Sequence, residues 1–432
     1  MQPDGSATAP LAASGGAPEA SRPVPVLARE RRGGWLPDRL YAWRNRLLGD
    51  AAFQRRMRRN PFTRFMARRR ARAMFDLCSG FVYSQVLAAA LELELFELLA
   101  DGPLELDAIA RATGLERDAA ATLVRSATSL KLLENRGGGR FGLGIHGAAL
   151  RANPGVQRMI EHHAFLYRDL GDPVALLRNE NVATNLSMFW DYDGARRAQC
   201  EELGKGDSGP YTELMSASQS MVAEQIVDSY PLRSHQCLLD VGGGDGTFLR
   251  SVARSAPDLS LILFDLPPVA CRAEARFAES GLPNPARCVG GSMFEDELPT
   301  GADVVSLVRV VHDHDDAEAL ELLGRCRRAL PDGGTLLLAE PMAREGGGDR
   351  ATDAYFGFYL QAMGRGRPRT ASELGDLLER AGFERVREVR THLPMLTSLL
   401  VARAAPRANA RVDSPADGAG ATDDASTDRR EG

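Results

Sequence analysis

The part of the chain after His235 alternates short apolar segments with glycine turns and amphipathic helices, and this pattern leaves few possible folds. Short apolar runs between turn signals are typical of buried β-strands. Strands that alternate with helices build a mostly parallel sheet covered by helices on both faces. Ligands of such sheets bind at the carboxyl ends of the strands. The five segments are QCLLDVGGGDG, LSLILFDLP, ARCVGGSMF, ADVVSLVRVVHD and GGTLLLAEPM.

The first strand ends in a glycine loop, Asp240–Gly246, with the pattern D-x-G-x-G-x-G through Gly242 and Gly244. Glycines let the backbone turn sharply and let a ligand approach amides that a Cβ would obstruct. The dinucleotide fingerprint G-x-G-x-x-G is not met, because Thr247 stands where its third glycine would be. A pyrophosphate site is therefore disfavoured. The loop is typical of S-adenosylmethionine-dependent methyltransferases, with Asp240 under the amino-acid end of the cofactor.

The next two strands end in side chains that suit the rest of this cofactor. Asp265 closes the second strand, where a carboxylate can accept hydrogen bonds from both ribose hydroxyls. The alternative is that Asp265 only caps the following helix. Ser292 and Met293 follow the third strand and are placed to meet the adenine, or else form an ordinary turn. Because the glycine loop and Asp265 lie in register on consecutive strands, together they predict a cofactor site.

The segment RVVHDHDD carries the candidate for proton transfer. His312 stands where the fourth strand ends, at the level expected for the sulfonium methyl, and is predicted to be the general base. The alternatives are a metal ligand and a core histidine; no third His or Cys lies nearby in sequence, so no metal is expected. Asp315 and Asp316 are predicted to cap the next helix. His314 is assigned no role.

A module of a different kind precedes this sheet. Residues 104–144 show a helix, a turn at Gly114, a second helix and a strand pair closed by Gly137–Gly139, the order of a winged helix. Such a module can place its second helix in the major groove of DNA. Here that helix has few basic groups to neutralise phosphates, so nucleic acid is not expected as a partner and a dimerising module is predicted.

The net charge of −5 hides a strongly basic stretch near the N-terminus. Between Arg29 and Arg72 there are fifteen arginines, opposed by three acids and interspersed with aromatic residues. This composition suits amphipathic helices on an anionic membrane surface, and residues 29–72 are predicted to make peripheral membrane contact. The alternative is an arm that packs on a partner subunit.

Composition also limits the compartment. The chain has six cysteines without a C-x-x-C pair, which indicates reduced core residues and a cytoplasmic location. The first residues lack the charge and apolar core of a signal peptide. The most apolar run, residues 81–100, is interrupted by three glutamates and predicts a core helix, because it is too short and too charged to span a bilayer.

With 432 residues the chain is too long for one typical domain. Helical periodicity with many aromatic residues and methionines fills the part between the winged helix and the sheet, as core or as walls for a long apolar ligand. The predicted organisation is a disordered tail (1–28), a basic amphipathic arm (29–75), a winged-helix dimerisation domain (76–150), a helical substrate-binding segment (151–231), a Rossmann-like domain (232–404) and a disordered acidic tail (405–432).

From about Ala71 to Arg403 the chain resembles the small-molecule O-methyltransferases typified by plant caffeic acid and bacterial hydroxyindole-type enzymes. The ordered motifs LLDVGGGDG, LFDLP, GGSMF, RVVHDHDD, LLLAEPM and RPRTASELGDLLERAGF carry this resemblance. It implies a class I methyltransferase fold with a mostly parallel seven-stranded sheet and a winged-helix domain that forms a homodimer. It also implies a base at His312, a supporting acid at Glu340 and further cofactor contacts from Gly243, Leu266 and Arg309.

Two positions depart from the family pattern. Many relatives have Asp where this chain has Ser292, which is a neutral and weaker acceptor for the adenine amine. Relatives often have an acid where this chain has Pro368, just before Arg-Thr. The resemblance therefore leaves open whether an acid other than Glu340 supports His312.

Within this family the segments WRNRLLGDAAFQ, NPFTRFMARRRARAMFDLCSGFVYSQVL and GDSGPYTELMSASQSMVAEQI are most similar to the carotenoid hydroxyl methyltransferases of purple photosynthetic bacteria. That resemblance implies an apolar acceptor, the 1-hydroxyl of an acyclic hydroxy-carotenoid, and a place on the photosynthetic membrane. Two alternatives stay open. One is methylation of a soluble phenolic or polyketide acceptor, and the other is a winged-helix regulatory or scaffolding protein that only binds the cofactor.

Overall fold

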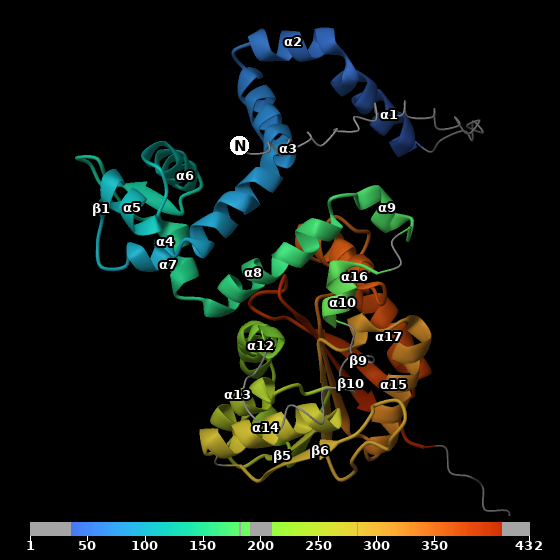
Figure 1. Ribbon diagram of the computed structural model, residues 1–432. Coiled ribbons are helices and arrows are strands. Elements are labelled where there is room, and N and C mark those ends of the chain that lie inside the picture. Colours follow the sequence, from blue (N-terminus) through green and yellow to red (C-terminus); the bar gives the residue numbers. More distant parts are fainter. Residues whose placement is uncertain (1–35, 181–182, 191–209, 283, 408–432) are drawn as a thin grey trace, which may run out of the picture. The chain divides into compact units, whose positions relative to one another are not determined.

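The computed structural model describes residues 36–180, 183–190, 210–282 and 284–407 (Figure 1). The predicted tails, apart from residues 405–407, and Cys200 lie outside these ranges. The chain separates into two compact units, one that ends at Val82 and one that begins at Tyr83.

The described part of the first unit is helical, and most of its large apolar side chains are exposed. Helix α2 starts after Asp50, whose carboxylate accepts hydrogen bonds from the backbone N–H groups of Ala52 and Phe53 at 2.6 and 2.8 Å, as an N-cap does. It has no buried residue. The helices are α1 (Leu36–Gly49), α2 (Ala51–Arg59) and α3 (Arg64–Glu92).

Helix α3 runs without a break through the predicted boundary between the arm and the winged helix. It is long and apolar enough to cross a membrane, and only 6% of its most apolar window is buried. The prediction of one core helix over residues 81–100 is wrong, because α3 ends at Glu92, and Glu94, with a left-handed backbone and φ of 51°, separates it from α4 (Leu95–Leu98). Phe81 is 72% exposed, whereas Ala90 is buried in the core of the winged helix.

The winged helix has the predicted order of elements. Gly114 ends α5 with φ of 69°, a conformation that favours glycine. Strand β3 pairs antiparallel with β2 and also with a short strand β1 that precedes α5. The elements are α4 (Leu95–Leu98), β1 (Leu104–Glu105), α5 (Leu106–Thr113), α6 (Arg117–Ser129), β2 (Leu133–Asn135), β3 (Arg140–Leu143) and α7 (Ile145–Arg151).

Four described helices connect the winged helix to the large sheet, and the longest two contact each other extensively. Part of the predicted Met and aromatic set in this segment lies outside the described residues. The helices are α8 (Pro154–Asp169), α9 (Pro173–Leu177), α10 (Asn185–Trp190) and α12 (Pro210–Ser229).

The large sheet has seven strands in the order β6-β5-β4-β7-β8-β10-β9. The first five are parallel, and β10 pairs antiparallel with both β8 and β9. This confirms the predicted mostly parallel, Rossmann-like sheet. The strands are β4 (Cys237–Val241), β5 (Ser260–Asp265), β6 (Ala286–Gly290), β7 (Val304–Val308), β8 (Thr335–Glu340), β9 (Phe383–Val389) and β10 (Ser398–Ala404).

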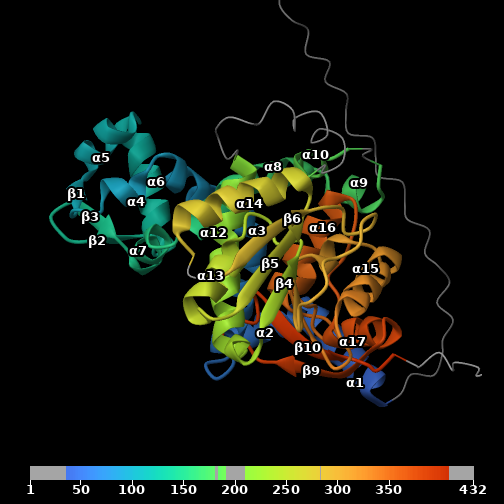
Figure 2. The same cartoon turned by 90° about the horizontal axis from the view of Figure 1, so that it is seen from below.

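Helices cover both faces of this sheet, as Figure 2 shows, so its central strands are apolar on both sides. One core lies between the sheet and α12, α13 and α14, and the other lies between the sheet and α15 and α17. The remaining elements are η1 (Leu232–Ser234), α13 (Thr247–Ser255), α14 (Pro267–Ser280), η2 (Val311–Asp313), α15 (Asp316–Ala329), the π-helix η3 (Arg350–Phe356), α16 (Gly357–Met363) and α17 (Ala371–Arg380).

The cysteines of the described residues are all free, and the prediction that they are core residues holds only in part. Cys326 is buried, whereas Cys78 and Cys271 are exposed. Periodicity does not decide the burial of a single small side chain at the edge of a helical face.

Candidate active site

The parallel register brings the predicted site residues to one edge of the sheet. Asp240 of β4 lies opposite Leu263 of β5 and Ser306 of β7, so the three strands end at the same level. Strand β8 then places its last residue, Glu340, at this carboxyl edge. Residues far apart in the sequence therefore share one site.

Asp240 is 1% exposed and holds only one side-chain hydrogen bond in the described part of the chain. The Ser306 hydroxyl donates to its Oδ1 at 2.6 Å, while Oδ2 is buried and has no hydrogen-bond partner among the described residues. Burial raises the pKa of Asp240 to about 7; the bond from Ser306 opposes this rise and the charge of Asp265 adds to it. A buried acceptor of this kind suits a ligand that brings a donor or a positive charge.

The glycine loop lies directly above Asp240. Gly242 and Gly244 have φ of 70° and 59°, which favours glycine. A Cβ on Gly243 would lie 2.8 Å from Asp240 Oδ2, and one on Gly242 would lie 2.8 Å from Val310 and 3.5 Å from Met293. A Cβ on Gly244 would meet no atom within 4 Å. The loop thus packs tightly against Asp240 and Val310 at Gly242 and Gly243, and its backbone is open at Gly244.

Asp265 joins the second strand to the glycine loop. Its Oδ2 accepts a hydrogen bond from the Gly244 N–H at 2.8 Å, and its Oδ1 accepts one from the Leu266 N–H at 2.7 Å. Leu266 itself is the N-cap residue of α14 and makes no side-chain cap bond. Asp265 therefore orients the glycine loop after β4. Neither the ribose interpretation nor the helix-cap interpretation of Asp265 predicted this contact.

Ser292 occupies a turn. Its hydroxyl oxygen accepts hydrogen bonds from the N–H groups of Phe294 and Glu295 at 3.3 and 3.2 Å, and its own N–H donates to Asp296 at 2.8 Å. These contacts fit the turn interpretation. Contact with adenine stays a prediction for Ser292 and for Met293.

His312 is 7% exposed and lies between two carboxylates. Its Nδ1 is hydrogen-bonded to Glu340 Oε2, and its Nε2 lies 3.2 Å from Asp313 Oδ1. Burial disfavours the imidazolium, but the negative charges of Asp313 and Glu340 and the bond to Glu340 outweigh it and raise the pKa of His312 above its ordinary value. Because Pro368 replaces an acid that relatives often have, the sequence left open whether a second carboxylate flanks His312. In the structure this second carboxylate is Asp313.

Glu340 is 2% exposed and holds the turn on which His312 stands. Its Oε1 accepts hydrogen bonds from the backbone N–H groups of Val310 and Val311 at 3.0 and 2.7 Å, so Oε2 remains for the histidine. One carboxylate at the end of β8 thus sets both the backbone and the ring orientation of the segment after β7.

Arg309 is the strained residue of this segment, with φ of 56°. A left-handed backbone is unfavourable for a side chain with a Cβ, and such residues concentrate at functional sites. Its guanidinium carbon lies 5.9 Å from the centre of the Phe356 ring, and its Nε is buried without a hydrogen-bond partner among the described residues. Its positive charge also lowers the pKa of His312, against the two acids.

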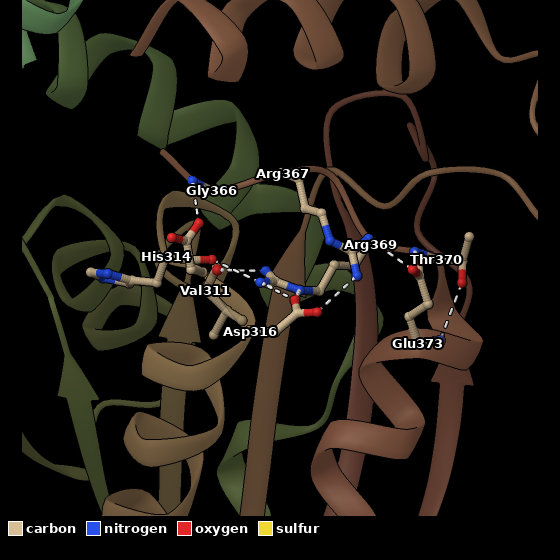
Figure 3. A network of polar contacts seen from close by, with 9 residues as sticks. Val311, His314, Asp316, Gly366, Arg367, Arg369, Thr370 and Glu373 are labelled. Carbon is tan, nitrogen blue, oxygen red and sulfur yellow. Dashed lines mark hydrogen bonds and ion pairs between the residues drawn. The ribbon is translucent and has the colours of Figure 1, made fainter. Parts of the chain in front are cut away.

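Arg369 secures the His312 segment from the other side (Figure 3). This 2% exposed residue donates hydrogen bonds to the carbonyl oxygens of Val311 and His314 at 2.9 and 2.7 Å, and it is paired with Asp316 at 2.7 Å. Asp316 is therefore the partner of a buried arginine.

The prediction that Asp315 and Asp316 cap the next helix is wrong in its side-chain contacts. Asp315 is the N-cap residue of α15, but its side chain makes no cap bond; its Oδ1 accepts from the Gly366 N–H at 3.3 Å. Gly366 has φ of 73°, and a Cβ there would collide with the carbonyl oxygen of His312. The segment before α17 lies close to the start of α15, so its residues Gly366 and Arg369 bind the carboxylates of Asp315 and Asp316.

Three residues of this site were missed by sequence reasoning: Asp313, Arg369 and Phe356. Asp313 is adjacent to His312 in HDHDD, and Arg369 lies in the motif RPRT, so both had a signal in the sequence. Phe356 had none, because its ring reaches His312, at 6.5 Å between ring centres, from the end of a π-helix.

The residues at this edge fit S-adenosylmethionine. The unpartnered, buried Oδ2 of Asp240 can accept from a cationic amino group, and the open backbone at Gly244 beside Asp265 can admit a ribose. In the described ranges no three His, Cys, Asp or Glu side chains are grouped so that they could hold a metal ion.

Comparison with known proteins identifies the family. The O-methyltransferase domain matches residues 167–384, and the O-methyltransferase dimerisation domain matches residues 75–145. Demethylspheroidene O-methyltransferase of Cereibacter sphaeroides is 43% identical over 83% of this chain and 93% of its own length. Acetylserotonin O-methyltransferase of Rattus norvegicus is 30% identical over 78% of each chain.

Solved structures of methyltransferases support the same family assignment. Human N-acetylserotonin methyltransferase in complex with S-adenosylmethionine superimposes with a TM-score of 0.65 at 25% identity, over 78% of this chain and 98% of that one. A methyltransferase of calicheamicin biosynthesis, in its S-adenosylhomocysteine-bound form, gives 0.65 at 27% identity over the same shares. The dimerisation domain supports a homodimer, and it contains the exposed apolar middle part of α3, residues 75–82. This chain belongs to the S-adenosylmethionine-dependent O-methyltransferase family.

Proposed function

We propose that this O-methyltransferase methylates the 1-hydroxyl of an acyclic hydroxy-carotenoid. The observation that carries the choice of acceptor is the 43% identity to demethylspheroidene O-methyltransferase over 93% of that protein. The acetylserotonin enzyme, which is named for a different acceptor, is 30% identical. The regulatory alternative is not favoured, because the relatives and structural neighbours are methyltransferases.

The reaction requires a base beside the reacting oxygen, and His312 is our candidate. The cofactor supplies an electrophilic methyl group on its sulfonium. With its Nδ1–H donated to Glu340, neutral His312 presents Nε2 to take the proton of the acceptor hydroxyl. An aliphatic alcohol is a far weaker acid than a phenol, so the proton must leave as the carbon–oxygen bond forms. Asp313 and Glu340 then stabilise the imidazolium.

Alignment of the cofactor methyl group with the acceptor oxygen supplies the remainder of the rate enhancement. Asp240, the glycine loop and Asp265 would hold the cofactor at the ends of β4 and β5, while His312 stands at the end of β7 on the same edge. Holding the two reactants in line converts an encounter in solution into a step within one complex.

The test is transfer of labelled methyl from S-adenosylmethionine to a detergent-dispersed 1-hydroxy acyclic carotenoid, beside a panel of phenols. We expect label in a carotenoid methyl ether. His312→Ala should abolish turnover and leave cofactor binding, measured by equilibrium dialysis, intact. Label on phenols alone would contradict the proposed acceptor, and loss of cofactor binding in His312→Ala would contradict the role of the histidine.

We further propose that the first unit contacts an anionic membrane surface from the cytoplasm. Its described helices carry arginines next to exposed apolar side chains, and the acceptor proposed above dissolves in membranes. Arg55, Arg56, Arg58 and Arg59 form the basic part of α2. The exposed apolar residues before the dimerisation-domain match are Leu40, Tyr41, Trp43, Phe62, Phe65, Met66 and Met74.

Removing charge from α2 should release the protein from vesicles. Each exposed arginine near an anionic surface contributes about 1 kcal/mol, so R55Q/R58Q should weaken partition by roughly 30-fold. The control R111Q/R125Q changes two exposed arginines of α5 and α6. Co-sedimentation with phosphatidylserine vesicles measures the effect. Equal binding by both variants would contradict membrane contact through α2, and a shift in dimerisation of R55Q/R58Q without a change in vesicle binding would identify a subunit contact instead.

A further inference from the structure

The π-helix η3 carries the aromatic side chain that lies next to the candidate base. Phe356, its last residue, packs in a T-shaped arrangement with the ring of His312, with the ring centres 6.5 Å apart and the planes at 76°. Arg309 lies over the same ring. Single turns of π-helix occur often at functional sites, because they shift a side chain out of the regular helical position.

Two histidines of α8 hold this π-helix and the helix that follows it. His163 Nε2 is hydrogen-bonded to the Tyr355 hydroxyl at 2.8 Å, and His162 Nε2 is hydrogen-bonded to the Tyr359 hydroxyl at 2.9 Å. Tyr355 also packs edge-on against Phe356, with ring centres 5.1 Å apart. A continuous set of contacts therefore runs from α8 through Tyr355 to Phe356 and His312.

The side chains of His162, His163 and Tyr355 are uncharged near neutral pH. Burial lowers the pKa of His162 to about 4, helped by neighbouring His163, and burial also lowers the pKa of His163. Burial raises the pKa of Tyr355 to about 12. The guanidinium of Arg309 lies over one face of the Phe356 ring, but the aromatic and histidine side chains themselves carry no charge. Such side chains next to a buried base suit an acceptor whose carbon skeleton is apolar up to the reacting hydroxyl.

We infer that Phe356 is a specificity-determining residue whose ring contacts the apolar carbons next to the reacting hydroxyl, and that His163 and Tyr355 form a pair that positions it. The inference rests on the proposed function, since it names the surface that the proposed acceptor meets at His312. Burial of an aromatic side chain against a ligand is worth enough to affect KM strongly.

The experiment compares Phe356→Ala with Phe358→Ala in the full chain. Phe358 is also partly buried, two residues further on, and packs in the core formed by α8, α9, α10 and α16. We expect Phe356→Ala to raise the acceptor KM by about 10- to 100-fold, with cofactor affinity unchanged, and Phe356→Leu to restore most of the loss. Phe358→Ala should lower the melting temperature without this rise in KM.

The pair is tested by a double-mutant cycle with Tyr355→Phe and His163→Ala. We expect each single variant to raise the acceptor KM severalfold and the double variant to be no worse than the worse single one, because both break one hydrogen bond. Additive effects would overturn the pair.

The proposed function fails if the wild type does not methylate the hydroxy-carotenoid. The inference about Phe356 fails if Phe356→Ala and Phe358→Ala give equal KM values with whichever acceptor the wild type uses. The two failures are therefore distinguishable.

Discussion

Replacing Glu340 with glutamine should lower kcat by about 10²- to 10⁴-fold, as expected when a general base is lost. The amide oxygen of glutamine can still accept from the N–H groups of Val310 and Val311. Its NH₂ group then faces His312 Nδ1, which must become an acceptor. The imidazole proton moves to Nε2, the nitrogen that should take the proton of the acceptor hydroxyl, so the residue is held in the wrong tautomer.

The pH profile separates this effect from a loss of stability. In the wild type the raised pKa of His312 keeps the imidazole protonated to a higher pH than in an ordinary histidine, so kcat/KM should rise with pH through an inflection above 6.5. Without the Glu340 charge the imidazolium is less stable, and the inflection should move to lower pH. The control is Glu318→Gln beside His314, where the two side chains lie 3.4 Å apart and Glu318 is half-exposed. A Glu340→Gln enzyme with the wild-type rate and profile would contradict this role.

Replacing Asp240 with asparagine should weaken cofactor binding and stabilise the cofactor-free protein above neutral pH. We propose that the Asp240 carboxylate accepts a charge-assisted hydrogen bond from the cationic amino group of the cofactor, and loss of this bond corresponds to about a 10- to 100-fold rise in the dissociation constant. Isothermal titration with S-adenosylmethionine measures this change. The control is Asp258→Asn, an exposed acid before β5, which should change neither quantity.

The stability effect of Asp240→Asn has a defined sign. The folded pKa of about 7 lies above the reference value of 3.8, so the wild type loses stability as pH rises from about 4 through 7, because folding then requires a buried charge. The shift corresponds to at most about 4 kcal/mol. In urea denaturation the variant should match or fall below the wild type at pH 4 and exceed it at pH 8. A variant that is less stable than the wild type at both pH values would contradict the prediction, because it would show that ionisation of buried Asp240 does not destabilise the folded state.

Local pattern was enough for the architecture. The alternation of strands and helices after His235 predicts the parallel sheet, and parallel strands must end at a common edge, so Asp240, Asp265 and His312 could be assigned to that edge from the sequence pattern. Glu340 was assigned from the family resemblance. The winged helix was predictable for the same reason, since Gly114 and the glycines at 137–139 mark its turns locally.

Contacts between distant segments could not be read in this way. Arg369 draws Asp316 away from capping α15, and Phe356 reaches His312 from a π-helix, because packing of separate elements decides which polar or aromatic group comes within range. Periodicity records which face of an element is buried, but it does not record its partner. The fold and the edge that carries the site were therefore encoded in short-range pattern, whereas the hydrogen bond of His312 to Glu340, the anchoring by Arg369 and the aromatic wall at Phe356 arise from long-range packing.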